Sequence, residues 1–145
     1  MPRFLLIIMA VAATGAMLVW AFGALRALRS GGSALPYLAM PNPLPDASRR
    51  EAVVCLGHTD LDQAPVTGNG GLWMNASQVM FHSAAGTVSI PRPLRFAEST
   101  TSVPELGLVE SAPMLSLGWT TSSGHDAVAV FRTPDATGWA IALRS

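Results

Sequence analysis

The sequence contains no lysine, a single cysteine and a single tyrosine, and only 12% of its 145 residues are charged. Cys55 has no second cysteine to pair with, so an intramolecular disulfide is excluded and nothing indicates an oxidising compartment. The chain also lacks the C-x-x-C, H-x-x-x-H and H-E-x-x-H spacings of metal sites, a phosphate-binding loop and the G-x-S-x-G element of hydrolases. We therefore expect no cofactor and no metal, and the sequence does not predict an enzyme.

The longest hydrophobic segment is an uninterrupted run, residues 4–25, without a charge, Asn, Gln or Pro. As an α-helix with a rise of about 1.5 Å per residue it would be roughly 33 Å long, enough to cross a hydrocarbon core of about 30 Å. Lipid offers the backbone no hydrogen-bond partners, so we expect a helical, single-pass transmembrane anchor. The residues assigned to this anchor and its basic flank are Phe4, Leu5, Leu18, Trp20, Phe22, Leu25, Arg26 and Arg29.

Two alternatives to an anchor are a cleaved signal peptide and a buried helix of a soluble protein. A signal peptide has an apolar core of about 7–15 residues with a cleavage site after it, whereas the best small-residue site here, 14–16, lies inside the run. A helix that is apolar on every side is difficult to bury in a chain of 145 residues. Arginines are more numerous after the run than before it, which favours a cell (inner) membrane protein with a cytoplasmic domain.

Charge is distributed unevenly along this formally neutral chain. Residues 1–50 carry five Arg and one Asp, whereas residues 51–145 carry four Arg and eight Asp or Glu. A net acidic region is not attracted to DNA, to RNA or to anionic lipid headgroups. Nucleic-acid binding is therefore not expected.

Three regions follow from the composition: an anchor with its basic flank (1–29), a linker rich in Pro and Gly (30–50) and a β domain (51–145). Four Pro and two Gly within residues 30–47 exclude a long helix or a central strand there. From residue 51 onward, short apolar or alternating runs are separated by turn signals, as in antiparallel β domains. A loop over 57–71 with a turn at Asn69-Gly70 and an irregular segment over 103–112 are also predicted. The expected strands are 51–56, 72–75, 78–83, 87–90, one that starts at 94, 114–120 and 127–131.

The C-terminal segment predicts one amphipathic helix. In Thr133-Pro134-Asp135 a hydroxyl can cap free N–H groups, Pro suits the first helical position, and an acid favours the positive end of the helix dipole. Trp139, Ala142 and Leu143 are three and four residues apart and so share one face. Trp139 and Leu143, together with Phe131 of the last strand, are expected to pack this helix onto the sheet.

Three segments carry a resemblance to bacterial pleckstrin-homology-like (PH-like) domains. Residues 72–91 (LWMNASQVMFHSAAGTVSIP) are similar to the family's hairpin and next strand, residues 118–133 (GWTTSSGHDAVAVFRT) to its last hairpin, and residues 134–143 (PDATGWAIAL) to its helix, with Trp139 at the family's characteristic Trp. The layout also resembles membrane-anchored actinobacterial versions, in which a span, an Arg-containing flank and a Pro-rich linker precede the domain. The resemblance implies a bent antiparallel sheet or partly open barrel with a C-terminal capping helix.

Members of this class that bind phosphoinositides place basic residues at the open end of the domain. Residues 51–145 are net acidic and contain no Lys, so phosphoinositide binding is not expected and the resemblance better supports protein binding. The sequence thus predicts a non-enzymatic, single-pass membrane protein whose PH-like domain contacts unidentified protein partners at the surface of the bilayer. A second hypothesis is a small accessory subunit of a larger membrane complex, docked through its transmembrane helix.

One polar cluster keeps an enzymatic alternative open. His58, Asp60 and Asp62 lie together in the segment HTDLD, whereas the other two histidines fall on separate expected elements. Such residues can bind a metal or move protons, so a small metal-dependent enzyme or hydrolase is the third and weakest hypothesis. A solvated loop is the interpretation that we prefer.

Overall fold

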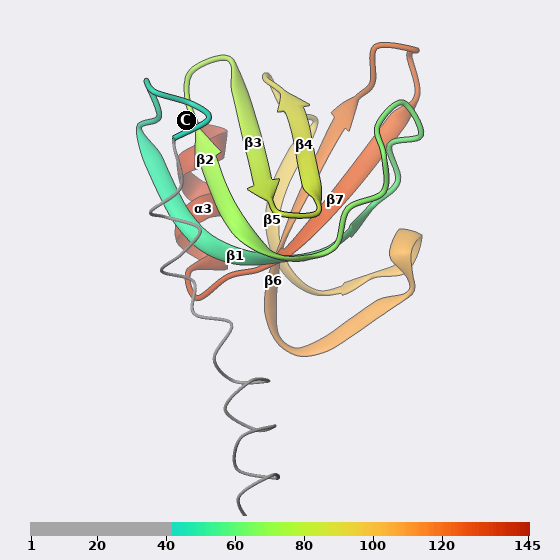
Figure 1. Cartoon of the computed structure of the whole chain (residues 1–145). Coiled ribbons are helices and arrows are strands. Elements are labelled where there is room, and N and C mark those ends of the chain that lie inside the picture. Colours follow the sequence, from blue (N-terminus) through green and yellow to red (C-terminus); the bar gives the residue numbers. More distant parts are fainter. Residues whose placement is uncertain (1–41) are drawn as a thin grey trace, which may run out of the picture. The chain divides into compact units, whose positions relative to one another are not determined.

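A computed structural model describes residues 42–145, which form a seven-stranded antiparallel sheet and one C-terminal α-helix (Figure 1). The mostly β fold with a C-terminal helix that the sequence predicts is confirmed. The expected anchor and most of the expected linker lie outside the described residues, and residues 42–145 contain no helix that is long and apolar enough to cross a membrane. The elements are β1 (Arg49–His58), β2 (Gly68–Met74), β3 (Gln78–Ser83), β4 (Gly86–Pro91), β5 (Phe96–Val103), the 3-10 helix η1 (Pro104–Leu106), β6 (Leu108–Thr120), β7 (Asp126–Arg132) and α3 (Ala136–Arg144).

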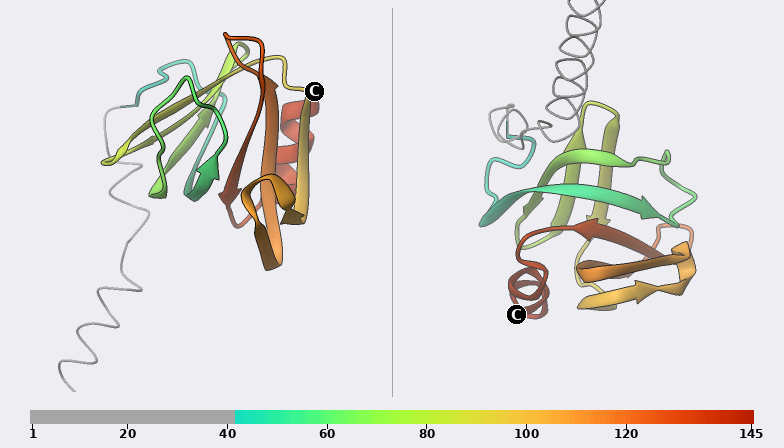
Figure 2. Two further views of the ribbon diagram at one scale, coloured as in Figure 1. Left: turned by 90° about the vertical axis from the view of Figure 1, so that its right-hand side faces the viewer. Right: turned by 90° about the horizontal axis from the view of Figure 1, so that it is seen from below.

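The sheet consists of two antiparallel meanders that are joined by its first and last strands. The strand order is β4-β3-β2-β1-β7-β6-β5, so β1 pairs with both β2 and β7, and β4 and β5 are the two edges. The sheet is strongly bent, and β1–β4 and β5–β7 form two walls with α3 at one end (Figure 2). Consecutive strands are neighbours in both meanders, as expected for short turns between antiparallel strands.

The main core lies between the two walls and beneath α3, because alternate residues of each strand face inward. All three residues expected to pack the helix onto the sheet, Trp139, Leu143 and Phe131, are buried in this core. A second, smaller cluster on the opposite face of β5–β7 is covered in part by η1. The main core contains Val53, Cys55, Val66, Leu72, Met74, Val79, Phe81, Val88, Ile90, Ala97, Leu115, Leu117, Trp119, Ala127, Ala129, Phe131, Ala136, Trp139, Ala140 and Leu143, and the second contains Val103, Met114, Val128 and Val130.

The predicted turn at Asn69-Gly70 is wrong, because both residues lie within β2. Gly70 is there for close packing: a Cβ atom at this position would lie 2.5 Å from the carbonyl oxygen of His82 and 2.5 Å from the ring of Phe81. A glycine in a strand often marks such a close approach. The glycine run therefore makes room inside the sheet and does not reverse the chain.

The predicted irregular segment over residues 103–112 is also partly wrong. Gly107, in the left-handed conformation with φ 64°, ends η1, and β6 then starts at Leu108 and pairs with the end of β5. The pairing joins Val103 to Leu108 and Ser102 to Val109 and forms a hairpin arm. Most residues of the first half of β6 are exposed or half-buried, so the apolar alternation that marks a strand in sequence is missing there.

The helix starts later than predicted and has a different cap. Asp135 is the N-cap of α3, and its Oδ1 atom accepts a hydrogen bond of 3.0 Å from the amide of Gly138. Thr133 lies outside the helix, and its hydroxyl accepts a weaker bond of 3.3 Å from the amide of Asp135. Asp and Thr are both good N-caps, and the position of Asp135 directly before the packed face decides between them.

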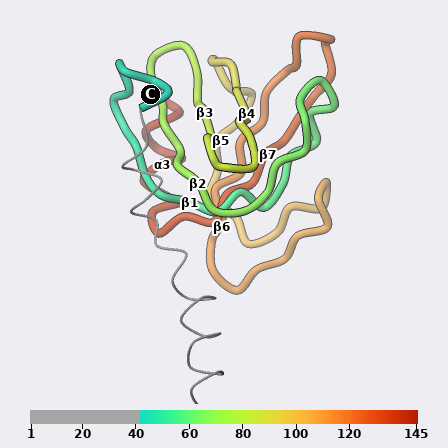
Figure 3. Tube along the Cα trace, in the orientation of Figure 1, coloured from blue at the N-terminus to red at the C-terminus, as the bar shows by residue number. Residues whose placement is uncertain are grey.

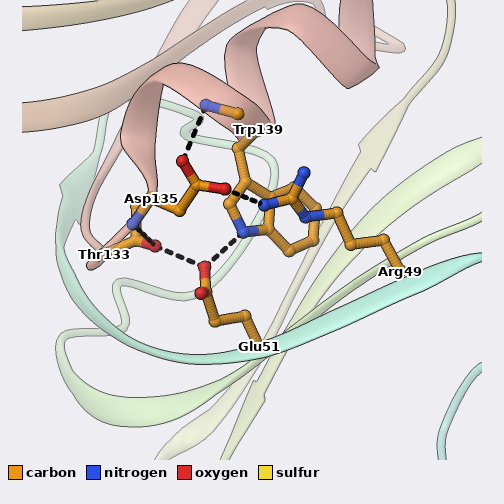
Figure 4. A network of polar contacts seen from close by, with 6 residues as sticks. Arg49, Glu51, Thr133, Asp135 and Trp139 are labelled. Carbon is orange, nitrogen blue, oxygen red and sulfur yellow. Dashed lines mark hydrogen bonds and ion pairs between the residues drawn. The ribbon is translucent and has the colours of Figure 1, made fainter.

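Polar contacts attach the first turn of α3 to β1 (Figure 4). The carboxylate of Glu51 accepts hydrogen bonds from the indole of Trp139 and from the hydroxyl of Thr133. Arg49 binds Asp135 at 2.7 Å, and its guanidinium carbon lies 4.6 Å from the centre of the Trp139 ring. The hydrogen bond from Arg49 lowers the pKa of Asp135, with help from the amide of Gly138. This group of side chains fixes the helix against the strand that joins the two meanders.

Cys55 is a core residue, as its apolar surroundings in the sequence indicate. Its side chain is 1% exposed, and the thiol donates a hydrogen bond of 3.3 Å to the carbonyl oxygen of Val66. Burial raises the pKa of this thiol from 9.0 to about 11, opposed by a smaller effect of the Gly57 backbone. The reactive thiolate is therefore suppressed in the folded protein.

We expect the free energy of unfolding of the wild-type protein to fall between pH 9 and 11, and that of Cys55→Ala to fall less over the same range. The thiol of the unfolded chain releases its proton above pH 9, while the folded chain retains its proton up to about pH 11. The contribution of Cys55 is thus complete below pH 9 and is lost as pH rises, with an upper bound of about 2–3 kcal/mol.

The measurement is urea unfolding of the full chain in mild detergent at pH 8, 9, 10 and 11. The chain has no Lys, so few other side chains titrate in this range. Parallel pH profiles of the wild-type protein and Cys55→Ala would contradict the expectation.

Candidate functional site

A groove of about 620 Å³ lies where the connection from β4 to β5 meets the end of α3. Figure 3 follows the chain through this connection, which contains the cis peptide bond between Arg92 and Pro93. The volume is in the range of protein ligand sites, about 300–1,000 Å³. We call this feature the arginine groove. Its lining residues are Ala76, Arg92, Pro93, Leu94, Arg95, Phe96, Ala97, Glu98, Leu143, Arg144 and Ser145.

Two of its three arginines are held by backbone carbonyl groups. Arg92 donates from Nη1 to the carbonyl oxygen of Asn75 at 2.8 Å, and from Nη2 to that of Leu143 at 3.5 Å. Arg144, near the end of α3, donates from Nε to the carbonyl oxygen of Ala97 in β5 at 2.7 Å. Neutral carbonyl groups orient these guanidinium groups but do not cancel their charge.

The third arginine has an acidic partner. Arg95 forms an ion pair of 2.5 Å with Asp126 at the start of β7, and both side chains are at least half exposed. An ion pair this exposed contributes little to stability, since water screens it. The amide of Arg95 donates to the carbonyl oxygen of Gly118, which places the residue directly before β5.

The charge of the groove is opposite to that of the domain around it. The side chains of three Arg and one Glu line it, a formal side-chain charge of +2, whereas the side chains of residues 51–145 as a whole carry a formal charge of −4. Elsewhere in residues 42–145, Arg49 pairs with Asp135 and Arg132 pairs with Glu110, whereas the exposed Arg50 has no carboxylate within 4.0 Å among the described residues. Arg92 and Arg144 have no carboxylate within 4.0 Å among the described residues. Three of the six arginines of residues 42–145 therefore line this one groove, and two of these three have no acidic partner among the described residues.

Apolar residues also line the groove. Leu94 packs against the main core, and Leu143 is one of the buried residues of α3. Phe96 also lines the groove, and its ring lies so close to Gly118 that a Cβ atom there would approach it to 2.1 Å. The groove can thus contact an apolar group and an anionic group at the same time.

The polar cluster of the sequence, His58, Asp60 and Asp62, lies elsewhere, in β1 and the loop after it. Nε2 of His58 lies 3.0 Å from the carbonyl oxygen of Ala64. Asp62 accepts hydrogen bonds from the β6–β7 turn, and the hydroxyl of Ser123 is the main cause of its lowered pKa. The three side chains therefore hold loops. Among residues 42–145, no group of three or more His, Cys, Asp or Glu is arranged to hold a metal ion.

Asp60 holds the side chain of Gln63, which contacts the backbone of β4; the sequence alone does not indicate this contact. It is 5% exposed, and its Oδ2 atom accepts a hydrogen bond of 2.7 Å from the side-chain amide (Nε2) of Gln63. The same Gln63 side chain donates to the carbonyl oxygen of Ser89 and accepts from its amide, at 2.8 and 2.7 Å. This pair of bonds covers part of the free edge of β4, and covered edges resist pairing with other chains.

The arginines of the groove were not predicted as a site. Arg92 and Arg95 are close in the segment RPLR after a strand, but Arg144 lies about fifty residues away in the helix. The one local signal in the sequence is that Arg92 and Arg95 stand on either side of Pro93. No spacing rule connects it to Arg144, because only the packing of α3 against β5 and β6 brings them together.

Comparisons of the chain with protein-family models, with curated proteins and with solved structures found no match.

Proposed function

We propose that this chain is a non-enzymatic, single-pass membrane protein whose PH-like domain makes protein contacts at the membrane surface through the arginine groove. The observation that carries this proposal is the groove itself, a concentration of fixed positive charge with apolar neighbours in an otherwise acidic domain. Aromatic and Arg side chains with open donors are typical of protein-binding surfaces.

The PH-like part of the proposal is supported by the topology. Four strands and three strands form two meanders that join through β1 and β7, and α3 contacts β5 and β6. This is the arrangement that the resemblance implies, a bent sheet with a C-terminal capping helix. The membrane part is supported by the apolar run of residues 4–25, which has the length and composition of a span.

Site-specific photo-crosslinking in intact producing cells tests the function. A photoreactive phenylalanine analogue replaces Glu98, an exposed residue of the groove, or Glu105, an equally exposed residue of η1 that serves as the matched control. We expect discrete protein adducts at position 98 and few at position 105. The same cells are extracted with alkaline carbonate, which removes peripheral proteins and leaves spanning proteins in the pellet.

The crosslinking tests the groove and the carbonate extraction tests the anchor, so either part of the proposal can be refuted without the other. Release of the chain by carbonate would refute the anchor. Equal labelling at the two positions, or adducts with lipid alone at position 98, would refute the groove as a protein-contact surface.

A further inference from the structure

We propose that the arginine groove binds an acidic segment of a partner protein, with a carboxylate between Arg92 and Arg144 and an apolar side chain against the half-buried Leu94 and Phe96. This inference rests on the proposed function and specifies its ligand. It follows from the unused donors of the two arginines and from the half-buried apolar residues that line the same groove.

Both arginines retain hydrogen-bond donors. A guanidinium group has five N–H groups, and Arg144 uses Nε for the carbonyl of Ala97, which leaves both of its Nη atoms without a protein acceptor among the described contacts. Arg92 uses Nη1 for Asn75, and its contact of 3.5 Å with Leu143 is at the limit of a hydrogen bond. A carboxylate matches the forked donors of a guanidinium and supplies the missing negative charge.

Capping of the helix explains only part of this arrangement. Carbonyl groups at a helix C-terminus favour a nearby cation, and Arg144, in the last turn of α3, is such a cation. Arg144 does not bind a helix carbonyl among the described contacts, because its Nε atom is directed to β5. The end of the helix therefore does not account for the direction of the Arg144 side chain.

A carboxylate-bearing peptide suits the groove better than a phosphate-rich ligand. Glu98 lines the groove and Asp126 pairs with Arg95 beside it, and both would repel a ligand with several negative charges. The acidic domain also opposes approach to an anionic bilayer. The half-buried Leu94 and Phe96 offer apolar contact that inorganic phosphate or a headgroup would not use.

The test selects ligands without assuming a partner. The full chain, held in nanodiscs of phosphatidylcholine, is used to select from a displayed library of random twelve-residue peptides. We expect the selected peptides to be enriched in Asp or Glu together with Leu, Ile or Phe. Replacing their acids by the corresponding amides is expected to weaken binding at least about tenfold, as the loss of a charged hydrogen bond implies.

Variants assign this binding to the groove. Arg92→Gln combined with Arg144→Gln is expected to lose at least about tenfold in affinity for the selected peptides. Arg132→Gln is the matched control, because Arg132 is also exposed but pairs with Glu110 outside the groove, and it is expected to bind normally. Thermal unfolding of each variant reports whether it is folded. The amide-substituted peptides test the wild-type chain directly, so the test does not depend on the variants.

Each contrary outcome has a distinct meaning. Selection of peptides without acidic enrichment, or equal binding by the double variant, would overturn the acidic ligand while the crosslinking result could still support the protein-binding function. Two results would overturn the acidic ligand in favour of a phosphate ligand. One is competition by millimolar inorganic phosphate. The other is that no acidic peptide is selected while phosphoinositide-containing nanodiscs bind in a way that requires both arginines. Loss of both peptide selection and adducts at position 98 would refute the function as well.

Discussion

Trp139→Ala is expected to lower the free energy of unfolding by about 3–5 kcal/mol, the largest effect of any single change considered. The indole is fully buried in the main core between α3 and the sheet. Its removal leaves a large cavity and also deprives Glu51 of the N–H group that it accepts from. The half-buried Glu51 carboxylate keeps its bond from Thr133, so the lost partner adds only part of the cost of an unsatisfied polar group.

Two further variants separate these contributions. Trp139→Phe keeps an aromatic ring in the core but removes the N–H group and part of the ring volume, so we expect a smaller loss of about 1–3 kcal/mol. Ile141→Ala changes an apolar residue of the same helix that is 63% exposed, and we expect an effect within about 0.5 kcal/mol.

Urea unfolding of the full chain in mild detergent, followed by the fluorescence of Trp73 and Trp119, measures all three variants. Both reporter side chains are buried and remain in every variant. A loss for Trp139→Ala as small as that for Ile141→Ala would show that the helix does not depend on this contact.

Gly70→Ala is expected to destabilise the protein by about 1–3 kcal/mol through overpacking. The added methyl group would meet both the backbone oxygen of His82 and the ring of Phe81 at about 2.5 Å. A ring can rotate or shift, but the backbone of β3 is held by its pairing with β2 and β4. The contact with the His82 oxygen therefore cannot be relieved without moving the backbone of β3.

The same unfolding experiment, with Asn69→Ala as the control, tests this expectation. Asn69 is the adjacent residue of β2 and is exposed, so its change to Ala is expected to have an effect below about 0.5 kcal/mol. Adding Phe81→Leu to Gly70→Ala should recover only part of the overpacking loss, because the contact with the His82 oxygen remains. Full stability of Gly70→Ala would mean that β2 and β3 are farther apart than described.

Local patterns predicted the strands that alternate clearly. Residues 78–83 were expected as a strand and form β3 with the same bounds, since its buried and half-buried residues alternate. The C-terminal helix was also predicted with its buried Trp139, because residues three and four apart share a face whatever lies beside them. The count of seven strands followed from turn signals between short runs.

The misplaced turn at Asn69-Gly70 has a physical cause that no local pattern contains. Glycine relieves strain in a turn and also permits close approach in a strand, so the residue type alone does not distinguish the two. The choice depends on the ring of Phe81, which comes from the next strand. The cap of α3 shows the same limit on a smaller scale, since Thr133 and Asp135 are both acceptable caps in isolation.

The sequence by itself determined the class of the domain, its helix and its uneven charge, because these depend on the spacing and type of neighbouring residues. The tertiary structure alone decided where the fixed positive charge lies. Arg92 and Arg144 are more than fifty positions apart in the chain, and they line one groove because α3 packs against β5. These arginines bind backbone carbonyl groups, and every residue has one. The sequence therefore does not indicate which carbonyl groups they bind, and only the folded structure does.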